Sequence, residues 1–133
     1  MINFIDDVQN VCNLALPWEQ LKNKTVLISG ASGMIGSFLI HVLLHKQLNI
    51  HVIALGRNEE RAKERFQEYW ESKNFSFISH DINNALELEE KVDFVIHAAS
   101  NTHPVAYATD PIGTILTNII GTRNMLDLAY AKA

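Results

Sequence analysis

The sequence predicts an α/β fold in which helices cover both faces of a parallel β-sheet. From residue 25 onward, short apolar segments alternate with longer segments whose apolar residues recur at helical spacing. Such alternation produces parallel βαβ units with right-handed crossovers. The short segments are also apolar almost throughout, as expected of strands that are buried on both faces.

The elements follow from these patterns in chain order. Residues 3–15 are expected to form an amphipathic helix that ends before Pro17, and residues 18–24 then lead into the sheet. Asn58 is placed to cap the helix after the second strand. The patterns predict strands over residues 25–30, 50–55, 74–79 and 92–97, helices over 34–46, 58–72 and 112–131, a helical turn over 84–90, and a loop from the fourth strand to Asp110.

The same patterns predict one domain with a short lead-in. We expect residues 1–24 to lie across the outside of the core, and residues 25–133 to form a doubly wound sheet that is truncated after about four strands. Most apolar residues of the last helix are expected to belong to the core. Asn118 lies within that apolar run, so we expect it to have a buried partner.

Composition limits the class of protein. The chain has 133 residues, of which 47% are hydrophobic and 20% are charged, as is typical of one globular domain with a substantial core. Its net charge of -4 argues against a nucleic-acid partner. No apolar run approaches the roughly 20 residues of a membrane span, and the first residues are acidic where a signal peptide is basic. Its one cysteine, Cys12, cannot form a disulfide within the chain, so a cytoplasmic setting is expected.

A glycine-rich turn follows the first predicted strand. Gly30, Gly33 and Gly36 have the spacing G-x-x-G-x-x-G, and an apolar helix follows. Gly30 permits a tight turn, Gly33 lets a pyrophosphate approach the backbone, and Gly36 lets the helix pack closely on the strand. The unpaired N–H groups of the helix N-terminus favour phosphate. Although glycine turns also occur in loops that bind nothing, this context predicts a dinucleotide-binding domain of the Rossmann type.

The end of the second strand bears on the choice of cofactor. In this fold an acidic residue at that point binds the ribose 2′-hydroxyl of NAD, whereas a basic residue accommodates the 2′-phosphate of NADP. Here the acid is missing and Arg57 follows Gly56. Arg57 therefore favours NADP, although an arginine that is merely exposed near a helix N-terminus explains the sequence equally well.

Two further segments follow strands at the expected ligand-binding edge of the sheet. Asp81 and Ile82 come after the third strand, where they can contact adenine, although an aspartate there is also common as a turn residue. His97 ends the fourth strand and is followed by small residues that let a cofactor lie close to the backbone. A lone histidine there is more often packed than catalytic. We predict no metal site, because His41 and His45 lack a third ligand.

These motifs together resemble the extended short-chain dehydrogenase/reductases, the NAD(P)-dependent epimerases and dehydratases of nucleotide sugars. Four motifs occur in the family's order over about residues 22–133. From His97 onward the sequence is most similar to UDP-glucuronate decarboxylases and dTDP-glucose 4,6-dehydratases. The motifs are Gly30-x-x-Gly33-x-x-Gly36, Asp81-Ile82, His97-Ala98-Ala99-Ser100 and Thr117-Asn118-x-x-Gly121-Thr122.

The resemblance implies a role for each matching residue. Gly30, Ser32, Gly33, Met34 and Ile35 would hold the pyrophosphate, and Asp81 and Ile82 the adenine. Ala98, Ala99 and Ser100 would line the ribose on the nicotinamide side. Thr117 would contact the cofactor, and Asn118 would support the backbone of the active site. A nucleotide sugar would be the substrate of the full-length protein. The family carries an acid where Arg57 stands, and so favours NAD.

The resemblance also implies what is missing. The family's catalytic Tyr-x-x-x-Lys lies beyond the next strand, and Tyr69-x-x-x-Lys73 matches that pattern only by coincidence, near the end of a helix on the wrong side of the fold. No catalytic residue is therefore assigned, and the chain alone is expected to be inactive. Because the fourth strand would expose an apolar edge, we also expect self-association. Two alternatives remain: a non-catalytic NAD(P)-binding module, or an NADP-dependent reductase of small carbonyls.

Overall fold

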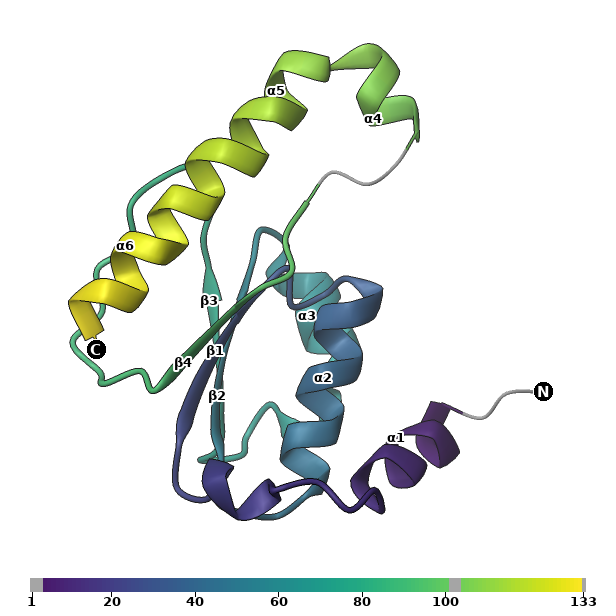
Figure 1. Ribbon diagram of the computed structural model, residues 1–133. Coiled ribbons are helices and arrows are strands. Elements are labelled where there is room, and N and C mark those ends of the chain that lie inside the picture. Colours follow the sequence, from purple (N-terminus) through teal and green to yellow (C-terminus); the bar gives the residue numbers. More distant parts are fainter. Residues whose placement is uncertain (1–3, 101–103, 133) are drawn as a thin grey trace.

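Four parallel strands form the sheet at the centre of the molecule (Figure 1). The computed structural model describes residues 4–100 and 104–132. Their order is β3–β2–β1–β4, so β1 lies between β2 and β4. Leu27 of β1 is level with Ile53 of β2 and with Val95 of β4. The strands are β1 (Thr25–Ser29), β2 (His51–Gly56), β3 (Phe75–Ser79) and β4 (Phe94–His97). The predicted α/β fold of the Rossmann type is confirmed.

Helices cover both faces of this sheet. Helix α2 (Met34–His45) and helix α3 (Glu59–Arg65) lie on one face, and helix α6 (Thr122–Lys132) lies on the other (Figure 1). Asn58 caps α3 as predicted, because its side chain accepts a hydrogen bond from the Arg61 N–H at 2.9 Å. Within residues 4–100 and 104–132, no helix is long and apolar enough to cross a membrane.

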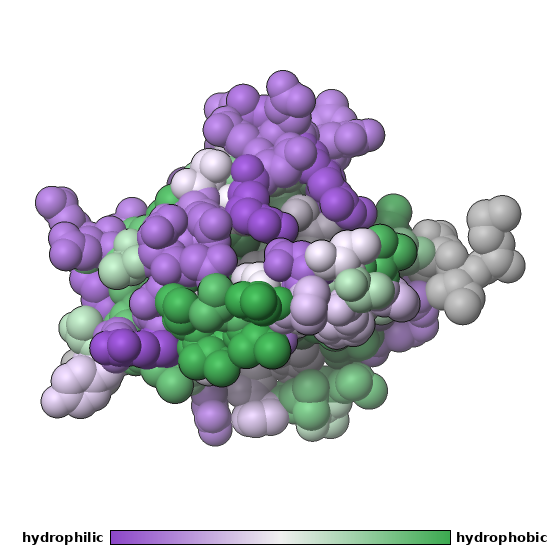
Figure 2. Space-filling model, turned by 90° about the horizontal axis from the view of Figure 1, so that it is seen from above, coloured by the Kyte–Doolittle hydropathy of each residue, from purple (hydrophilic) through white to green (hydrophobic). Residues whose placement is uncertain are grey.

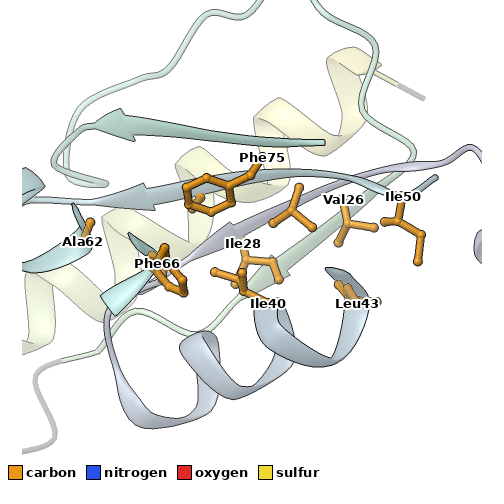
Figure 3. Packing of buried hydrophobic residues seen from close by; sticks show 11 residues of the cluster. Val26, Ile28, Ile40, Leu43, Ile50, Ala62, Phe66 and Phe75 are labelled. Atoms are coloured by element: carbon orange, nitrogen blue, oxygen red, sulfur yellow. The ribbon is translucent and has the colours of Figure 1, made fainter. Parts of the chain in front are cut away.

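The alternation of side chains along β1 builds the core on both faces. Val26 and Ile28 point to the face of α2, where they pack with Ile40, and Phe66 belongs to the same cluster (Figure 3). Leu27 points to the opposite face, in a second cluster with residues of α6. Successive side chains of a strand point to opposite faces. A strand that is covered on both sides must therefore be apolar throughout, as the sequence of β1 is.

The N-terminal segment packs on the outer side of α2. Helix α1 (Phe4–Cys12) buries Val8 and Cys12 against Val42 of α2. The Lys46 ammonium group donates to the Cys12 carbonyl oxygen at 3.0 Å and lies 4.7 Å from the ring centre of Trp18. Trp18 begins the short helix η1 (Trp18–Leu21) that leads into β1. Helix α1 ends three residues earlier than predicted, and residue 3 lies outside the described residues.

Three connecting segments differ from the prediction. Helix α3 ends at Arg65, and the short helix η2 (Gln67–Tyr69) follows, because Phe66 leaves the helical conformation (φ -114°, ψ 28°) with its ring fully buried in the core. Residues 84–90 form no helix, because Leu86 and Leu88 both turn toward the core from an irregular segment. The predicted loop after β4 contains helix α4 (Pro104–Thr109).

The last helical segment is continuous but less buried than predicted. It consists of α5 (Pro111–Leu116), the π-helical turn η3 (Thr117–Gly121) and α6, and the Asp110 carboxylate caps it by accepting from the Gly113 N–H at 2.9 Å. Only the part of it nearest the sheet contributes large buried apolar side chains, Met125 and Leu128. The expectation that most of its apolar residues are core is wrong. Those left exposed are Ile112, Ile115, Leu116, Ile119, Ile120, Leu126 and Tyr130.

Replacing Leu27 with alanine tests the packing of the core between the sheet and α6. Leu27 is fully buried on the α6 face, so Leu27→Ala should lower the free energy of unfolding by about 2–5 kcal/mol through lost burial and the cavity left behind. Urea denaturation measures this change. Leu126→Ala is the matched control, because Leu126 is 64% exposed and its truncation should change stability by less than about 0.5 kcal/mol. Equal losses in the two variants would contradict this description of the core.

Candidate functional site

A cleft lies at the carboxyl ends of the strands, where the connections from β1 and β4 diverge to opposite faces of the sheet. Its volume is about 250 Å³. In open α/β sheets this switch point is where ligands bind. The cleft brings together ten of the predicted residues, namely Gly30, Ser32, Gly33, Arg57, Asp81, Ile82, Ala98, Ala99, Ser100 and Thr117.

The glycine turn brings three backbone segments into close contact. Gly30 has a positive φ of 69°, and a Cβ at this position would lie 2.6 Å from the carbonyl oxygen of Ala98. Gly36 lies against the other side of Gly30, so closely that a Cβ there would overlap the Gly30 carbonyl oxygen. The end of β1, the first turn of α2 and the end of β4 can therefore meet only where side chains are absent.

The N-terminus of α2 points its backbone N–H groups out of this turn. Gly33 is the N-cap residue in extended conformation, and no side chain caps the helix. The N–H groups of a helix's first turn have no partner within the helix and carry partial positive charge. Met34 and Ile35 do not line the cleft and are 83% and 64% exposed. The first turn of α2 is thus open to an anion such as a diphosphate.

Two arginines border the cleft beyond β2. Arg57 lies there as expected, and Arg61 of α3 joins it. Neither guanidinium group forms an ion pair with any residue of the described chain. Sequence reasoning missed Arg61, although its position four residues after Arg57 at the start of a predicted helix was a usable signal. His80, Leu55 and Gly56 line the cleft as well and were also missed.

Asp81 and Ile82 both line the cleft, and each also has a structural role. One Asp81 carboxylate oxygen accepts from the Asn83 N–H at 3.0 Å, which is the turn geometry that the sequence left as an alternative. Asp81 nevertheless lines the cleft. Ile82 is buried and packs against Gly121, where a Cβ would lie 2.6 Å from the Ile82 Cδ1 atom. Ile82 therefore links the cleft to the long C-terminal helix.

The carboxyl end of β4 is held by two side-chain hydrogen bonds. His97 Nδ1 lies 2.7 Å from the hydroxyl oxygen of Ser29, which is fully buried. Burial lowers the pKa of His97. The Ser100 hydroxyl donates to the Asn118 side-chain oxygen at 3.0 Å. The expectation of a buried partner for Asn118 is wrong, because both residues are exposed. The expectation arose from the apolar run around Asn118, whose members are themselves exposed.

The π-helical turn η3 brings the C-terminal helix to the rim of the cleft. The Asn83 side-chain amide donates to the Thr117 hydroxyl at 3.3 Å, and the Thr122 hydroxyl donates to the Asn118 carbonyl oxygen at 2.5 Å. Single π-helical turns within α-helices are frequent at functional sites. Thr117 lines the cleft from this turn.

Other candidate groups lie elsewhere. Tyr69 lies in η2, outside the cleft, so the Tyr69-x-x-x-Lys73 match has no place in this site. Across residues 4–100 and 104–132, no group of three or more His, Cys, Asp or Glu side chains is arranged to hold a metal ion.

Comparison with known proteins agrees with this geometry. Residues 26–133 match the model of the NAD dependent epimerase/dehydratase family. The chain belongs to this family. The match begins with β1 and covers the sheet, the cleft and the C-terminal helix, but not α1.

Relatives of the epimerase/dehydratase chain include UDP-glucuronic acid decarboxylases. UDP-glucuronic acid decarboxylase 3 of Arabidopsis thaliana is 37% identical over 107 residues, covering 80% of this chain and 30% of the relative. UDP-glucuronic acid decarboxylase 1 of Danio rerio is 38% identical over 107 residues, covering 80% of this chain and 24% of the relative. The chain thus spans less than a third of the length of these relatives.

Solved structures share the fold. Pen from Bacillus thuringiensis superposes with a TM-score of 0.75 at 30% identity, covering 84% of this chain and 35% of that chain. The dTDP-glucose 4,6-dehydratase of Bacillus anthracis, solved in complex with NAD, superposes with a TM-score of 0.65 at 22% identity, covering 81% and 34%. At that identity the second likeness concerns the fold alone.

Two histidines, His41 (buried) and His97 (half-buried), make stability depend on pH. Burial holds the pKa values of His41 and His97 below the ordinary value, so the unfolded chain binds protons that the native chain does not. Stability is therefore complete above about pH 6.5 and falls as pH drops below it. His97→Gln should make the decrease between pH 7 and pH 5 shallower in urea denaturation. His45→Gln, at an exposed position, should leave it unchanged. Equal pH dependence in the His97 variant and the parent would contradict this assignment.

Proposed function

We propose that this chain is the NAD(P)-binding part of a nucleotide-sugar-modifying enzyme. A single observation carries the proposal: one cleft joins the uncapped N-terminus of α2, the arginines after β2, and the small residues after β4. When bound, the cofactor would accept a hydride from a sugar carbon and later return it. The UDP-glucuronic acid decarboxylases among the relatives support a nucleotide sugar as the substrate class.

The residues present fit a dinucleotide. The first turn of α2 offers N–H groups to the diphosphate, and the glycines leave backbone exposed there. Asp81 has a carboxylate oxygen that is not used in its turn and can accept a hydrogen bond from an adenine amino group. Ala98 and Ala99 leave space beside the backbone of β4 for the second ribose. The chain's contribution is thus to bind and orient the cofactor.

We further propose that the cofactor is NADP. Arg57 and Arg61 border the cleft together without carboxylate partners in the described part of the chain. A 2′-phosphate would be bound by two guanidinium groups, which suit phosphate geometry. NAD would leave both cations without a partner. The family's usual acid is absent from this position, so NAD loses its characteristic contact.

Cofactor titration by calorimetry tests both proposals. NADP⁺ should bind the chain more tightly than NAD⁺. Arg57→Ala and Arg61→Ala should each weaken NADP⁺ binding by about tenfold, because each removes a charge-assisted hydrogen bond. Neither substitution should change the affinity for NAD⁺. Lys63→Ala is the matched control, since Lys63 lies on α3 outside the cleft and pairs with Glu59.

The outcomes separate the alternatives. Equal affinity for the two cofactors, unchanged by either arginine substitution, would refute the preference for NADP. We propose that the chain alone is inactive, because none of the described residues that line the cleft is a tyrosine or lysine able to take a proton from a sugar hydroxyl. Turnover of UDP-glucuronate by the chain alone would contradict this inactivity and would also exclude the non-catalytic binding module. Reduction of a small carbonyl by NADPH would favour the carbonyl reductase instead.

We propose that the chain self-associates. Strand β4 is hydrogen-bonded to β1 alone within the described residues, and its Phe94 is 44% exposed. An unpaired apolar edge can accept a strand from a second copy of the chain. Apolar side chains also gather on the face of the molecule seen in Figure 2. Ile112 and Ile115 of α5 are exposed as well.

Analytical ultracentrifugation tests this association. The chain should sediment as a dimer or larger species at high micromolar concentration. Phe94→Lys, at the 44% exposed position of the edge strand, should shift it toward monomer, because a charge on an edge strand opposes pairing. A monomer of the parent chain at every concentration would refute the proposal.

We also propose a cytoplasmic location. Cys12 is a buried free thiol that donates to the Val42 carbonyl oxygen, and such a thiol persists in a reducing compartment. Labelling of the cysteine in intact cells tests the location. A protein recovered only from an oxidising compartment would contradict it.

A further inference from the structure

A second hollow lies on the other side of α2, between α1 and the two segments α3 and η2. Its volume is about 480 Å³, within the range of small-molecule sites. It shares no lining residue with the cleft at the strand ends. One wall is formed by Phe4, Ile5 and Val8 of α1, which lies outside the region matched by the family model. This surface is referred to below as the α1 groove.

The polar side chains His41, Glu68 and Tyr69 line the α1 groove and contact one another. His41 is 8% exposed, and its Nδ1 atom lies 3.2 Å from a Glu68 carboxylate oxygen. Burial and a hydrogen bond to Glu68 raise the pKa of Tyr69 to about 12, so its hydroxyl stays protonated and donates to the same carboxylate. The Glu68 side chain is 63% exposed, and its carboxylate is held by His41 and Tyr69.

Arg65 places a positively charged guanidinium group on the rim of the groove. Its Nη1 atom donates to the Ser37 hydroxyl at 3.0 Å, and Ser37 in turn donates to the Met34 carbonyl oxygen. Arg65 has no ion pair within the described residues. A guanidinium group has five N–H donors, so Arg65, which lines the groove, has donors beyond the one that binds Ser37. His45 lines the groove as well.

The apolar wall is exposed on the other side of the same hollow. Phe4 is 44% exposed and Ile5 is 60% exposed. The Phe4 ring packs edge-on against both Phe38 and His41, at ring-centre distances of 5.7 and 5.0 Å. The wall is thereby held in place rather than free to collapse onto Arg65. An apolar wall that faces a fixed guanidinium group matches a molecule with an apolar body and one acidic end.

We propose that the α1 groove binds a small amphipathic anion, namely a carboxylate carried on an aromatic or short aliphatic body. Arg65 holds the carboxylate through charge-assisted hydrogen bonds. Phe4, Ile5 and Val8 cover the apolar body. The lining of the groove differs from that of the cleft: among the described residues it contains no glycine, and it shares no residue with the cleft.

Amide NMR titration of the full chain with phenylbutyrate tests the proposal. Chemical-shift changes should concentrate in residues 4–8, 41–45 and 65–69. Arg65→Gln should weaken phenylbutyrate binding by about tenfold, which corresponds to one hydrogen bond to a charged group. The neutral analogue phenylbutanol should bind the variant and the parent equally. Lys63→Gln, on the same helix but outside the groove, should leave phenylbutyrate binding unchanged.

A second pair of variants keeps the test independent of the arginine. Ile5→Glu adds a negative charge at an exposed position on the apolar wall and should also weaken phenylbutyrate binding. Leu14→Glu, at a position that is 53% exposed and outside the groove, should not. Shift changes confined to residues 105–120, equal affinity in Arg65→Gln and the parent, or no shift changes at millimolar phenylbutyrate would each overturn the proposal.

Discussion

The close backbone contact at Gly30 is the constraint on which the candidate site depends. A Cβ at Gly30 would lie 2.6 Å from the Ala98 carbonyl oxygen, and the conformation itself (φ 69°) is strained for any residue with a side chain. Gly36 completes the contact from the other side. Because the end of β1, the first turn of α2 and the segment after β4 meet at this point, the first turn of α2 and the small residues after β4 face the same cleft. A side chain at either glycine would separate the groups that the cleft brings together.

The two-sided core holds these segments in register. Side chains of β1 alternate between the cluster under α2 and α3 and the cluster under α6. Helix α6 packs on the sheet, and its extension through η3 carries Thr117 to the rim of the cleft. The close contact between Gly121 and the Ile82 side chain holds that extension against the segment that follows β3. The site is therefore built by long-range packing, although most of its residues lie in short local motifs.

Much of the fold was predictable because its signals are local. Apolar strands, the glycine turn and the Asn58 cap depend on neighbouring residues, and their boundaries were correct to within one or two residues. The end of α3 at Phe66 was not predictable, because it depends on the burial of that ring between elements distant in sequence. The exposure of Ile112 and Ile115 also depends on what packs against the helix, which helical spacing alone does not reveal. Arg61 was missed for a different reason: its spacing from Arg57 was a usable local signal that the prediction did not apply.

The cleft lies at the N-terminus of α2 and the α1 groove beside His41 and His45 of the same helix, and both use residues of α3. Arg61 borders one and Arg65 borders the other. A crystal structure of the chain grown with NADP⁺ would show where the cofactor binds. We expect the diphosphate at the first turn of α2, the 2′-phosphate between Arg57 and Arg61, and adenine beside Asp81. Cofactor density elsewhere on the molecule, or a saturated crystal with no density in the cleft, would contradict this expectation.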